Sequence, residues 1–271
     1  MIDAVIDRFG LTRMPFGRDL PPGRLHRHAD CAEAAARITW AVAGKTIGVI
    51  TGEVGTGKTA AVRAAVAGLD PAAHTVVYVG NPTAGTRGIL TRVVTALGGR
   101  PVHGTAALAV QAWNILAGEA AERGRTPVLI LDEAHLLDHE QLEAVRMMTN
   151  HEMDSSTPFA TILVGQPTLR HNIKLGVLAA LDQRITVRYQ MKGMTPDETA
   201  SYIRHHLEAA GRTADLFTDD AVTQIHQAAR GKPRTVNNIA IAALIATAGA
   251  GKNLVDHAAA RAAIAEITAT D

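Results

Sequence analysis

The chain has 271 residues, of which 47% are hydrophobic and 3% aromatic, and its formal net charge at pH 7 is +1. This length suits one large domain or two smaller ones. Because the net charge is so small, it gives no general electrostatic argument for nucleic-acid binding, and any basic surface must be local. Cys31 is the only cysteine, which excludes a disulfide framework or a cysteine-based zinc site within one chain.

The sequence shows no sign of a membrane or export segment. No apolar run approaches the roughly 18–20 residues that a membrane-spanning helix needs. The first residues include Asp3, Asp7 and Arg8 and lack the apolar centre of a signal peptide. We therefore expect a soluble, cytoplasmic protein without a membrane partner, which fits the scarcity of cysteine.

The first part of the chain leads into a strand and a helix. Residues 1–30 look irregular, because aromatic residues stand beside glycine and proline turn formers. Residues 29–43 predict a helix with Ile38, Trp40 and Val42 on one side. The apolar run 47–50 predicts a strand, and residues 60–66 predict the next helix.

A glycine-rich loop connects that strand to that helix. Residues 52–59 fit the pattern G-x-x-x-x-G-K-[ST] at every fixed position. Its glycines let backbone N–H groups converge on phosphate oxygens, and the helix N-terminus adds partial positive charge. Lys58 can neutralise the β- and γ-phosphates, and the Thr59 hydroxyl can ligate Mg²⁺. The predicted loop of an ATP and Mg²⁺ site consists of Gly52, Glu53, Val54, Gly55, Thr56, Gly57, Lys58 and Thr59.

Two carboxylates follow the most apolar strand. Residues 127–131 are apolar without alternation, as a central parallel strand requires. Such a strand delivers Asp132 to the edge of the sheet where ligands of α/β proteins bind, and there Asp132 can hold Mg²⁺. Glu133 is placed to polarise an attacking water, which predicts hydrolysis rather than binding alone.

Two more polar residues belong near this edge. Asn81 follows the strand predicted at residues 75–79; it is either a turn residue before Pro82 or a polar partner that holds Glu133 inactive until a ligand arrives. His135 completes Asp-Glu-Ala-His, which also occurs in helicases, and we assign His135 to local structure rather than to catalysis.

The remaining elements define the fold class. Strands separated by helices predict an α/β fold with a parallel five-stranded sheet flanked by helices and right-handed crossovers. Further predicted elements of this part are helices at 86–97, 106–121, 138–152 and 178–182 and strands at 159–164 and 185–189.

The pattern changes from Thr195, where a capping residue, a proline and two acids begin a helix. We expect His205 and His206 on a solvated helix face and no zinc site. All-helical spacing is predicted at 196–210, 218–230, 234–248 and 255–267. The resulting organisation is an N-terminal extension at 1–28, an α/β domain at 29–193 and a small helical domain at 194–271.

Together these features resemble AAA+ ATPases with a phosphate loop and a helical lid. Within that superfamily, residues 51–59, Leu131–His135 and Val164–Arg170 look like the ExeA/TniB/TnsC group. The opening residues 9–12, with Pro15-Phe16, are also similar to that group's start. The resemblance covers nearly the whole chain and implies ATP hydrolysis in a ring or filament of identical subunits.

The resemblance also assigns roles to three residues. Gln166 matches a polar sensor of the γ-phosphate, and Arg234 matches the second sensor on the lid, where Pro233 begins a helix. Arg184 matches the arginine finger, which acts in trans on a neighbouring subunit's γ-phosphate. The alternative for Arg184 is a surface ion pair with Asp182.

Two functions fit these features. One is a DNA-transposition helper that assembles on double-stranded DNA and recruits or regulates a transposase; the other is an ExeA-like ATPase of secretion or cell-envelope assembly. Envelope members carry a membrane segment and a peptidoglycan-binding domain after the lid, so an end at Asp271 favours the DNA interpretation. A regulatory ATPase with a protein client is a third possibility. Candidate DNA contacts are Arg87, Arg92, Arg100, His103 and Lys174.

Overall fold

A computed structural model describes residues 2–17, 19–150 and 157–269. Their contacts divide the chain into two compact units, which we call the α/β unit and the helical unit. The α/β unit consists of Glu33–Val54 and Lys58–Met191. The helical unit consists of Met1–Ala32, Gly55–Gly57 and Lys192–Asp271.

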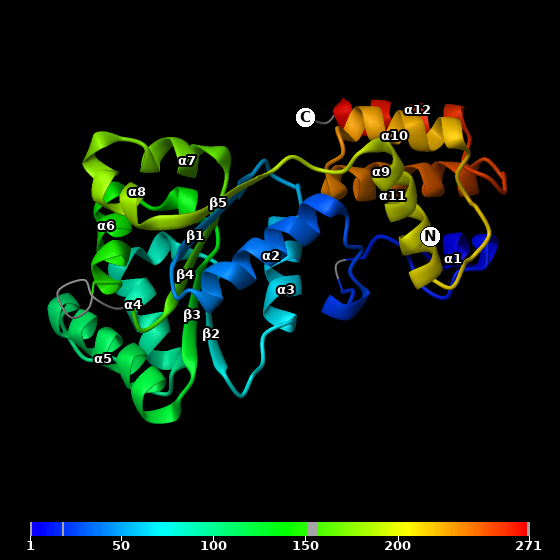
Figure 1. Cartoon of the computed structure of the whole chain (residues 1–271). Helices are drawn as coiled ribbons and strands as arrows, with labels where there is room; N and C mark the ends of the chain where they lie inside the picture. Colours follow the sequence, from blue (N-terminus) through cyan, green and yellow to red (C-terminus); the bar gives the residue numbers. More distant parts are fainter. Residues whose placement is uncertain (1, 18, 151–156, 270–271) are drawn as a thin grey trace. The chain divides into compact units, whose positions relative to one another are not determined.

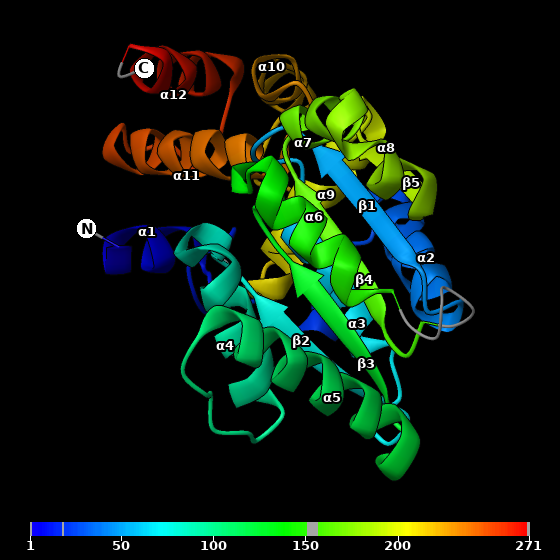
Figure 2. The same cartoon turned by 90° about the vertical axis from the view of Figure 1, so that its left-hand side faces the viewer.

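A parallel five-stranded sheet forms the centre of the α/β unit, as the sequence predicts, with the strand order β2-β3-β4-β1-β5 (Figures 1 and 2). β1 and β4 are buried along their whole length, because a central parallel strand is covered on both faces. The strands are β1 (Ile47–Gly52), β2 (His74–Val79), β3 (Thr126–Leu131), β4 (Ala160–Gly165) and β5 (Ile185–Met191).

The strand register brings the ends of the strands to one edge. Thr51 lies opposite Gly165 and Gln190, and Val79 lies opposite Leu131. The segments that follow β1, β2, β3 and β4 therefore all leave the sheet at its carboxyl edge, where ligands of open α/β sheets bind.

Helices cover both faces of this sheet. α4, α5 and α6 lie on one face, and α2 and α3 lie on the other (Figures 1 and 2). The helices are α2 (Ala29–Ala43), α3 (Lys58–Ala67), α4 (Gly85–Ala96), α5 (Thr105–Arg123), α6 (His139–Met148), α7 (Pro167–Ile173) and α8 (Ala179–Arg184). Short 3-10 turns are η1 (Pro22–Arg24) in the helical unit and η2 (Pro82–Ala84), η3 (Ala134–Leu136) and η5 (Gly176–Leu178) here.

Two predictions for these helices need correction. Trp40 is 58% exposed, whereas Ile38 and Val42 are buried; residues two apart on a helix point about 200° apart, so Trp40 cannot share their face. α6 ends at Met148 instead of continuing to residue 150, and residues 151–152 of the predicted helix lie outside the described part of the chain.

The helical unit joins an N-terminal helix to four helices from the end of the chain. Its helices are α1 (Ile2–Phe9), α9 (Pro196–Ala209), α10 (Asp219–Ala229), α11 (Pro233–Gly249) and α12 (His257–Thr268). The prediction that residues 1–30 are irregular is wrong for α1, which packs against α11 and buries Val5 and Phe9 (Figure 1). So short a helix is stabilised by packing rather than by its own propensity.

Polar contacts also hold the N-terminal segment to the other helices of this unit. Thr12 N–H donates to the carbonyl of Ala210 at 2.8 Å, and Ala29 N–H donates to Glu198 Oε1 at 2.7 Å. Asp30 Oδ2 accepts from the N–H groups of Lys192 and Gly193 at 2.7 and 2.9 Å. The first 32 residues are therefore part of the helical unit's fold.

His206 is buried, contrary to the prediction of a solvated pair. Its side chain stacks on Phe16 with ring centroids 5.2 Å apart and lies 4.5 Å from the Tyr202 ring. The aromatic partner comes from the N-terminal segment, so the sequence around residue 206 could not reveal it. Among the described residues, no helix has both the length and the apolar character to cross a membrane.

Candidate active site

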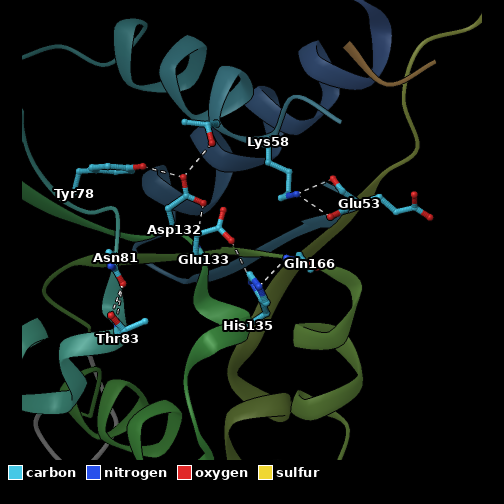
Figure 3. A network of polar contacts seen from close by, with 11 residues as sticks. Glu53, Lys58, Tyr78, Asn81, Thr83, Asp132, Glu133, His135 and Gln166 are labelled. Carbon is cyan, nitrogen blue, oxygen red and sulfur yellow. Dashed lines mark hydrogen bonds and ion pairs between the residues drawn. The ribbon is translucent and has the colours of Figure 1, made fainter. Parts of the chain in front are cut away.

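The phosphate loop begins where β1 ends and stops where α3 begins. Gly55 and Gly57 have φ angles of 84° and 96°, a left-handed conformation that favours glycine. Lys58 is buried, and its Nζ donates to the carbonyls of Gly52 and Glu53 at 2.8 and 2.9 Å (Figure 3). The ammonium is thus held inside the curve of the loop by backbone oxygens, close to where an anion would be cradled.

Asp132 accepts hydrogen bonds from several elements at the carboxyl edge of the sheet. It is 3% exposed, and its Oδ2 accepts from the Thr59 hydroxyl at 3.1 Å and from the Tyr78 hydroxyl at 2.8 Å. Its Oδ1 accepts from the N–H of Glu133 at 2.9 Å. These bonds join the start of α3 and the ends of β2 and β3 through one carboxylate (Figure 3).

Tyr78 is a site residue that the sequence reasoning missed. Burial and the hydrogen bond to Asp132 raise the pKa of its hydroxyl above its usual value, so Tyr78 remains a hydrogen-bond donor to this carboxylate. In the sequence, only its position near the end of a strand points to Tyr78: it is the second-last residue of β2 and lies opposite Ile130 in β3.

Thr59 and Asp132 fit a magnesium ion. A hydroxyl and a carboxylate oxygen 3.1 Å apart are hard oxygen donors carried on two rigid elements. In phosphate-transfer sites Mg²⁺ takes one or two such protein ligands and completes its shell with phosphate and water oxygens. The described residues contain no group of three or more His, Cys, Asp or Glu side chains that could hold a metal ion.

Glu133 has an uncommon backbone conformation. Its φ and ψ are 54° and 31°, a left-handed geometry that costs a residue other than glycine about 1–3 kcal/mol and clusters at functional sites. The turn presents its side chain, 45% exposed, beside the buried Asp132. Glu133 is therefore accessible to solvent at the point where Asp132 is not.

Gln166 and His135 contact each other at the same edge. Gln166 precedes α7, and its Nε2 lies 2.9 Å from His135 Nε2. The end of β4 approaches η3 so closely that a Cβ on Gly165 would lie 3.0 Å from the backbone nitrogen of His135. Glycine at 165 therefore allows the end of β4 and the turn after β3 to meet.

Asn81 has the contacts of a turn residue. Its Oδ1 accepts from the N–H and the hydroxyl of Thr83 at 3.0 and 2.7 Å (Figure 3). These bonds cap η2, so the side chain does locally what an asparagine before a proline commonly does. Its second suggested role, as a partner of Glu133, stays a prediction.

Arg184 lies away from this cluster. It ends α8 immediately before β5, so it stands at the amino edge of the parallel sheet. Asp132 and Glu133 stand at the other edge, where the strands end. Its Nη1 donates to Thr149 Oγ1 at 3.3 Å, whereas Asp182 binds Nη1 of Arg188 at 2.6 Å.

The remaining candidate residues are exposed. Arg234 lies in the first turn of α11, where its N–H donates to the carbonyl of Gly55, another residue of the helical unit, at 3.2 Å. The candidate DNA contacts, found on α4, in the following loop and after α7, are Arg87, Arg92, Arg100, His103 and Lys174.

Comparison with known proteins gives related sequences and a shared fold. Residues 42–173 match the AAA domain family. The general secretion pathway protein A of Aeromonas hydrophila is 32% identical over 254 residues, which is 92% of this chain but 46% of the relative. Cdc6p from Pyrobaculum aerophilum matches with a TM-score of 0.69 and 15% identity, covering 89% of this chain and 67% of that one.

The Aeropyrum pernix ORC1 protein, solved in complex with DNA, matches with a TM-score of 0.63 and 17% identity. This match covers 93% of the present chain and 67% of ORC1. At these identities the likeness to ORC1 and Cdc6p shows a common fold: an α/β unit with a phosphate loop, followed by helices. The chain spans less than half the length of the secretion relative.

Proposed function

We propose that this chain binds ATP and hydrolyses it to ADP and phosphate with Mg²⁺, because residues 42–173 match the AAA domain family and the fold resembles that of Cdc6p from Pyrobaculum aerophilum. One observation carries the proposal: the hydrogen bond from Thr59 to Asp132, which joins the phosphate loop to the acidic strand end. A phosphate loop alone indicates binding. A loop joined to a buried aspartate, with an exposed glutamate as its neighbour, supports hydrolysis.

The binding step uses the loop and its lysine. The backbone N–H groups of residues 52–59 hold the phosphate oxygens, and Lys58 exchanges its carbonyl partners for the β- and γ-phosphates. Thr59 and Asp132 would hold Mg²⁺, which supplies positive charge against the charge of the phosphates. Tyr78 keeps Asp132 oriented through its hydroxyl.

The chemical step uses Glu133. Its carboxylate accepts a proton from a water whose oxygen attacks the γ-phosphorus, while the bond from this phosphorus to the β–γ bridging oxygen breaks and ADP leaves. Gln166 donates to the oxygens of the transferred group. Arg234 contributes from α11 as the second sensor.

We propose that Arg184 serves a neighbouring subunit. Its place at the amino edge of the sheet separates it from its own phosphate loop, at the opposite edge, because the strands are parallel. A guanidinium at the end of α8 is suited to stabilise charge in a site completed by a second copy. The expected active form is therefore a ring or helical oligomer.

The client of the ATPase has two candidates. The related secretion pathway protein favours a role in secretion or cell-envelope assembly. The transposition-helper role, with double-stranded DNA and a transposase as partners, is favoured only by exposed basic residues such as Arg87 and Arg92 and by a fold shared with the Aeropyrum pernix ORC1 protein, solved in complex with DNA. Electron microscopy with duplex DNA and a slowly hydrolysed ATP analogue distinguishes these candidates: DNA-bound rings or filaments support the second, and no association at low salt supports the first.

The test of hydrolysis compares Glu133→Gln with Lys58→Ala. We expect Glu133→Gln to bind ATP with near-normal affinity and lose about 100- to 10,000-fold in turnover, because only the proton acceptor is removed. Lys58→Ala should lose nucleotide binding itself. Phosphate release, measured with Mg²⁺ and with excess chelator, is the readout, and normal turnover by either variant contradicts the site assignment.

A further inference from the structure

His135 lies beside the Glu133 carboxylate. The Asn81 amide oxygen is engaged by Thr83. The Glu133 carboxylate instead lies beside an imidazole, with 3.5 Å between Glu133 Oε2 and His135 Nδ1 (Figure 3). The side chain of His135 is 10% exposed, whereas that of Glu133 is 45% exposed, so the imidazole is the buried partner of this contact.

The contact with Gln166 fixes which nitrogen of His135 carries the proton. Gln166 Nε2 is an amide nitrogen and can only donate, so His135 Nε2, 2.9 Å away, must accept. In a neutral imidazole the proton then resides on Nδ1. Nδ1 is buried and makes no hydrogen bond of normal geometry. A buried N–H without an acceptor is costly, and the Glu133 carboxylate is the acceptor that faces it.

The backbone is arranged around this pair. Glu133 takes its left-handed conformation one residue before η3 begins, and the absence of a side chain at Gly165 lets β4 lie close to the backbone nitrogen of His135 in the same turn. Two sequence positions are thus constrained so that Gln166, His135 and Glu133 come within reach of one another. Strained or glycine-dependent geometry of this kind concentrates at working sites.

We propose that His135 is a positioning residue that couples Gln166 to Glu133. Gln166 holds the imidazole in the tautomer whose Nδ1–H is directed at the Glu133 carboxylate, and this donor orients the carboxylate that accepts the proton of the attacking water. The Gln166 amide carries a second N–H, which can donate to the γ-phosphate. The state of the nucleotide is thereby linked to the orientation of the base through His135. The inference rests on the proposed ATPase function.

A pair of amide substitutions separates the two nitrogens of the ring. His135→Asn keeps an N–H donor near the Nδ1 position, and His135→Gln keeps a polar group near the Nε2 position. We expect His135→Ala and His135→Gln to lose about 10- to 100-fold in kcat with KM nearly unchanged, because misplacing a catalytic group by about 1 Å costs this much. His135→Asn should recover most of that loss. Equal turnover by the Asn and Gln variants overturns the proposal even if His135→Ala does not fold.

A double-mutant cycle tests the link to Gln166. If His135 acts together with Gln166, then Gln166→Ala and His135→Ala combined should lose no more turnover than the worse single variant. Losses that multiply mean independent residues and overturn the coupling. Affinity for an ATP analogue and thermal melting confirm that each variant is folded.

Glu133→Gln in the same assay distinguishes this inference from the proposal beneath it. A Glu133→Gln variant with normal turnover means that the proposed hydrolysis chemistry is wrong. An inactive Glu133→Gln beside a fully active His135→Ala overturns the role of His135 alone.

Discussion

Buried polar side chains have different surroundings in the two units. In the α/β unit, Lys58 and Asp132 are buried at the edge of a sheet and bind groups from several strands and loops. In the helical unit, His206 and Thr199 are buried among helices, and His206 stacks on Phe16 from the N-terminal segment. Lys58 and Asp132 thus belong to the proposed ATP site, whereas His206 and Thr199 belong to the packing between helices. Substitutions in the first unit should change rates, and those in the second should change stability.

Among the further substitutions that test this comparison, Arg184→Ala should have the largest effect. If Arg184 acts as the proposed arginine finger, turnover in the assembled protein should fall about 1,000-fold or more, while ATP binding by a single subunit persists. Mixing this variant with Lys58→Ala should restore activity, because one supplies the loop and the other the guanidinium. Arg188→Ala, which removes a cation bound to Asp182, is the matched control. Full-rate hydrolysis by a monomer contradicts the trans role.

Asp132→Asn comes next. The amide keeps the shape and an acceptor oxygen but removes the charge that would face Mg²⁺, so turnover should fall about 100- to 1,000-fold. Tyr78→Phe removes one hydrogen bond to the same carboxylate and leaves its charge, so a much smaller loss is expected. Comparable losses of turnover in Asp132→Asn and Tyr78→Phe would mean that packing at the edge of the sheet, and not the charge of Asp132, is responsible.

In the helical unit we expect a pH effect on stability. Burial, followed by the neighbouring charges of His205, His26 and Arg13, lowers the pKa of His206 from 6.5 to about 4. The folded state binds this proton less well than the unfolded state, so stability is complete above pH 6.5 and is lost as the pH falls toward 4. At pH 5 the loss from this group is about 2 kcal/mol.

Urea unfolding at pH 7.5 and pH 5 measures this loss. His206→Phe keeps an aromatic ring against Phe16 and should reduce the difference between the two pH values. Substituting the exposed His171 should not. If the pH effect on stability is undiminished in His206→Phe, other groups cause it. A large drop in the ATPase rate of His206→Phe at pH 7.5 would contradict the expectation that substitutions in the helical unit change stability and not rate.

The smallest effect concerns the N-terminal segment. Glu198 accepts from the N–H groups of Ala29 and Thr195 with its two carboxylate oxygens, and Glu198→Gln leaves one oxygen for them. We expect a loss of about 1 kcal/mol in unfolding free energy and faster proteolysis within residues 1–28. ATP turnover should stay unchanged. The exposed Glu208 of the same helix, changed to Gln, serves as the control.

The sequence predicts well what depends on local pattern. The phosphate loop and the buried strands are continuous in the chain, so glycine spacing and apolar runs reveal the sheet and place Asp132 at its edge. α7 was missed because seven residues are too few to establish a periodicity, although Pro167 marks its start. The helix of residues 2–9 was missed although Val5 and Phe9 have helical spacing, because its partners come from the far end of the chain.

The environment of Glu133 could not be predicted in the same way. Asn81 and His135 both stand near the ends of strands, and the sequence suggests only Asn81 as a partner of the glutamate while assigning His135 to local structure. Which side chain lies beside Glu133 depends on its left-handed turn and on the close approach of Gly165 to the backbone of His135. Both features depend on how segments far apart in the sequence meet in the fold. Tyr78 is similar, because its bond to Asp132 requires the register of two strands.

The division of the chain has a consequence for synthesis on the ribosome. The residues that bury Phe9, Leu11 and Phe16 lie at or after Met194, whereas the α/β unit is complete at Met191. At roughly 5–20 residues per second, the N-terminal segment leaves the exit tunnel on the order of 10–50 s before its partners are made. During that interval its aromatic side chains are exposed, so a chaperone bound to the nascent chain has most to protect at its first 20 residues.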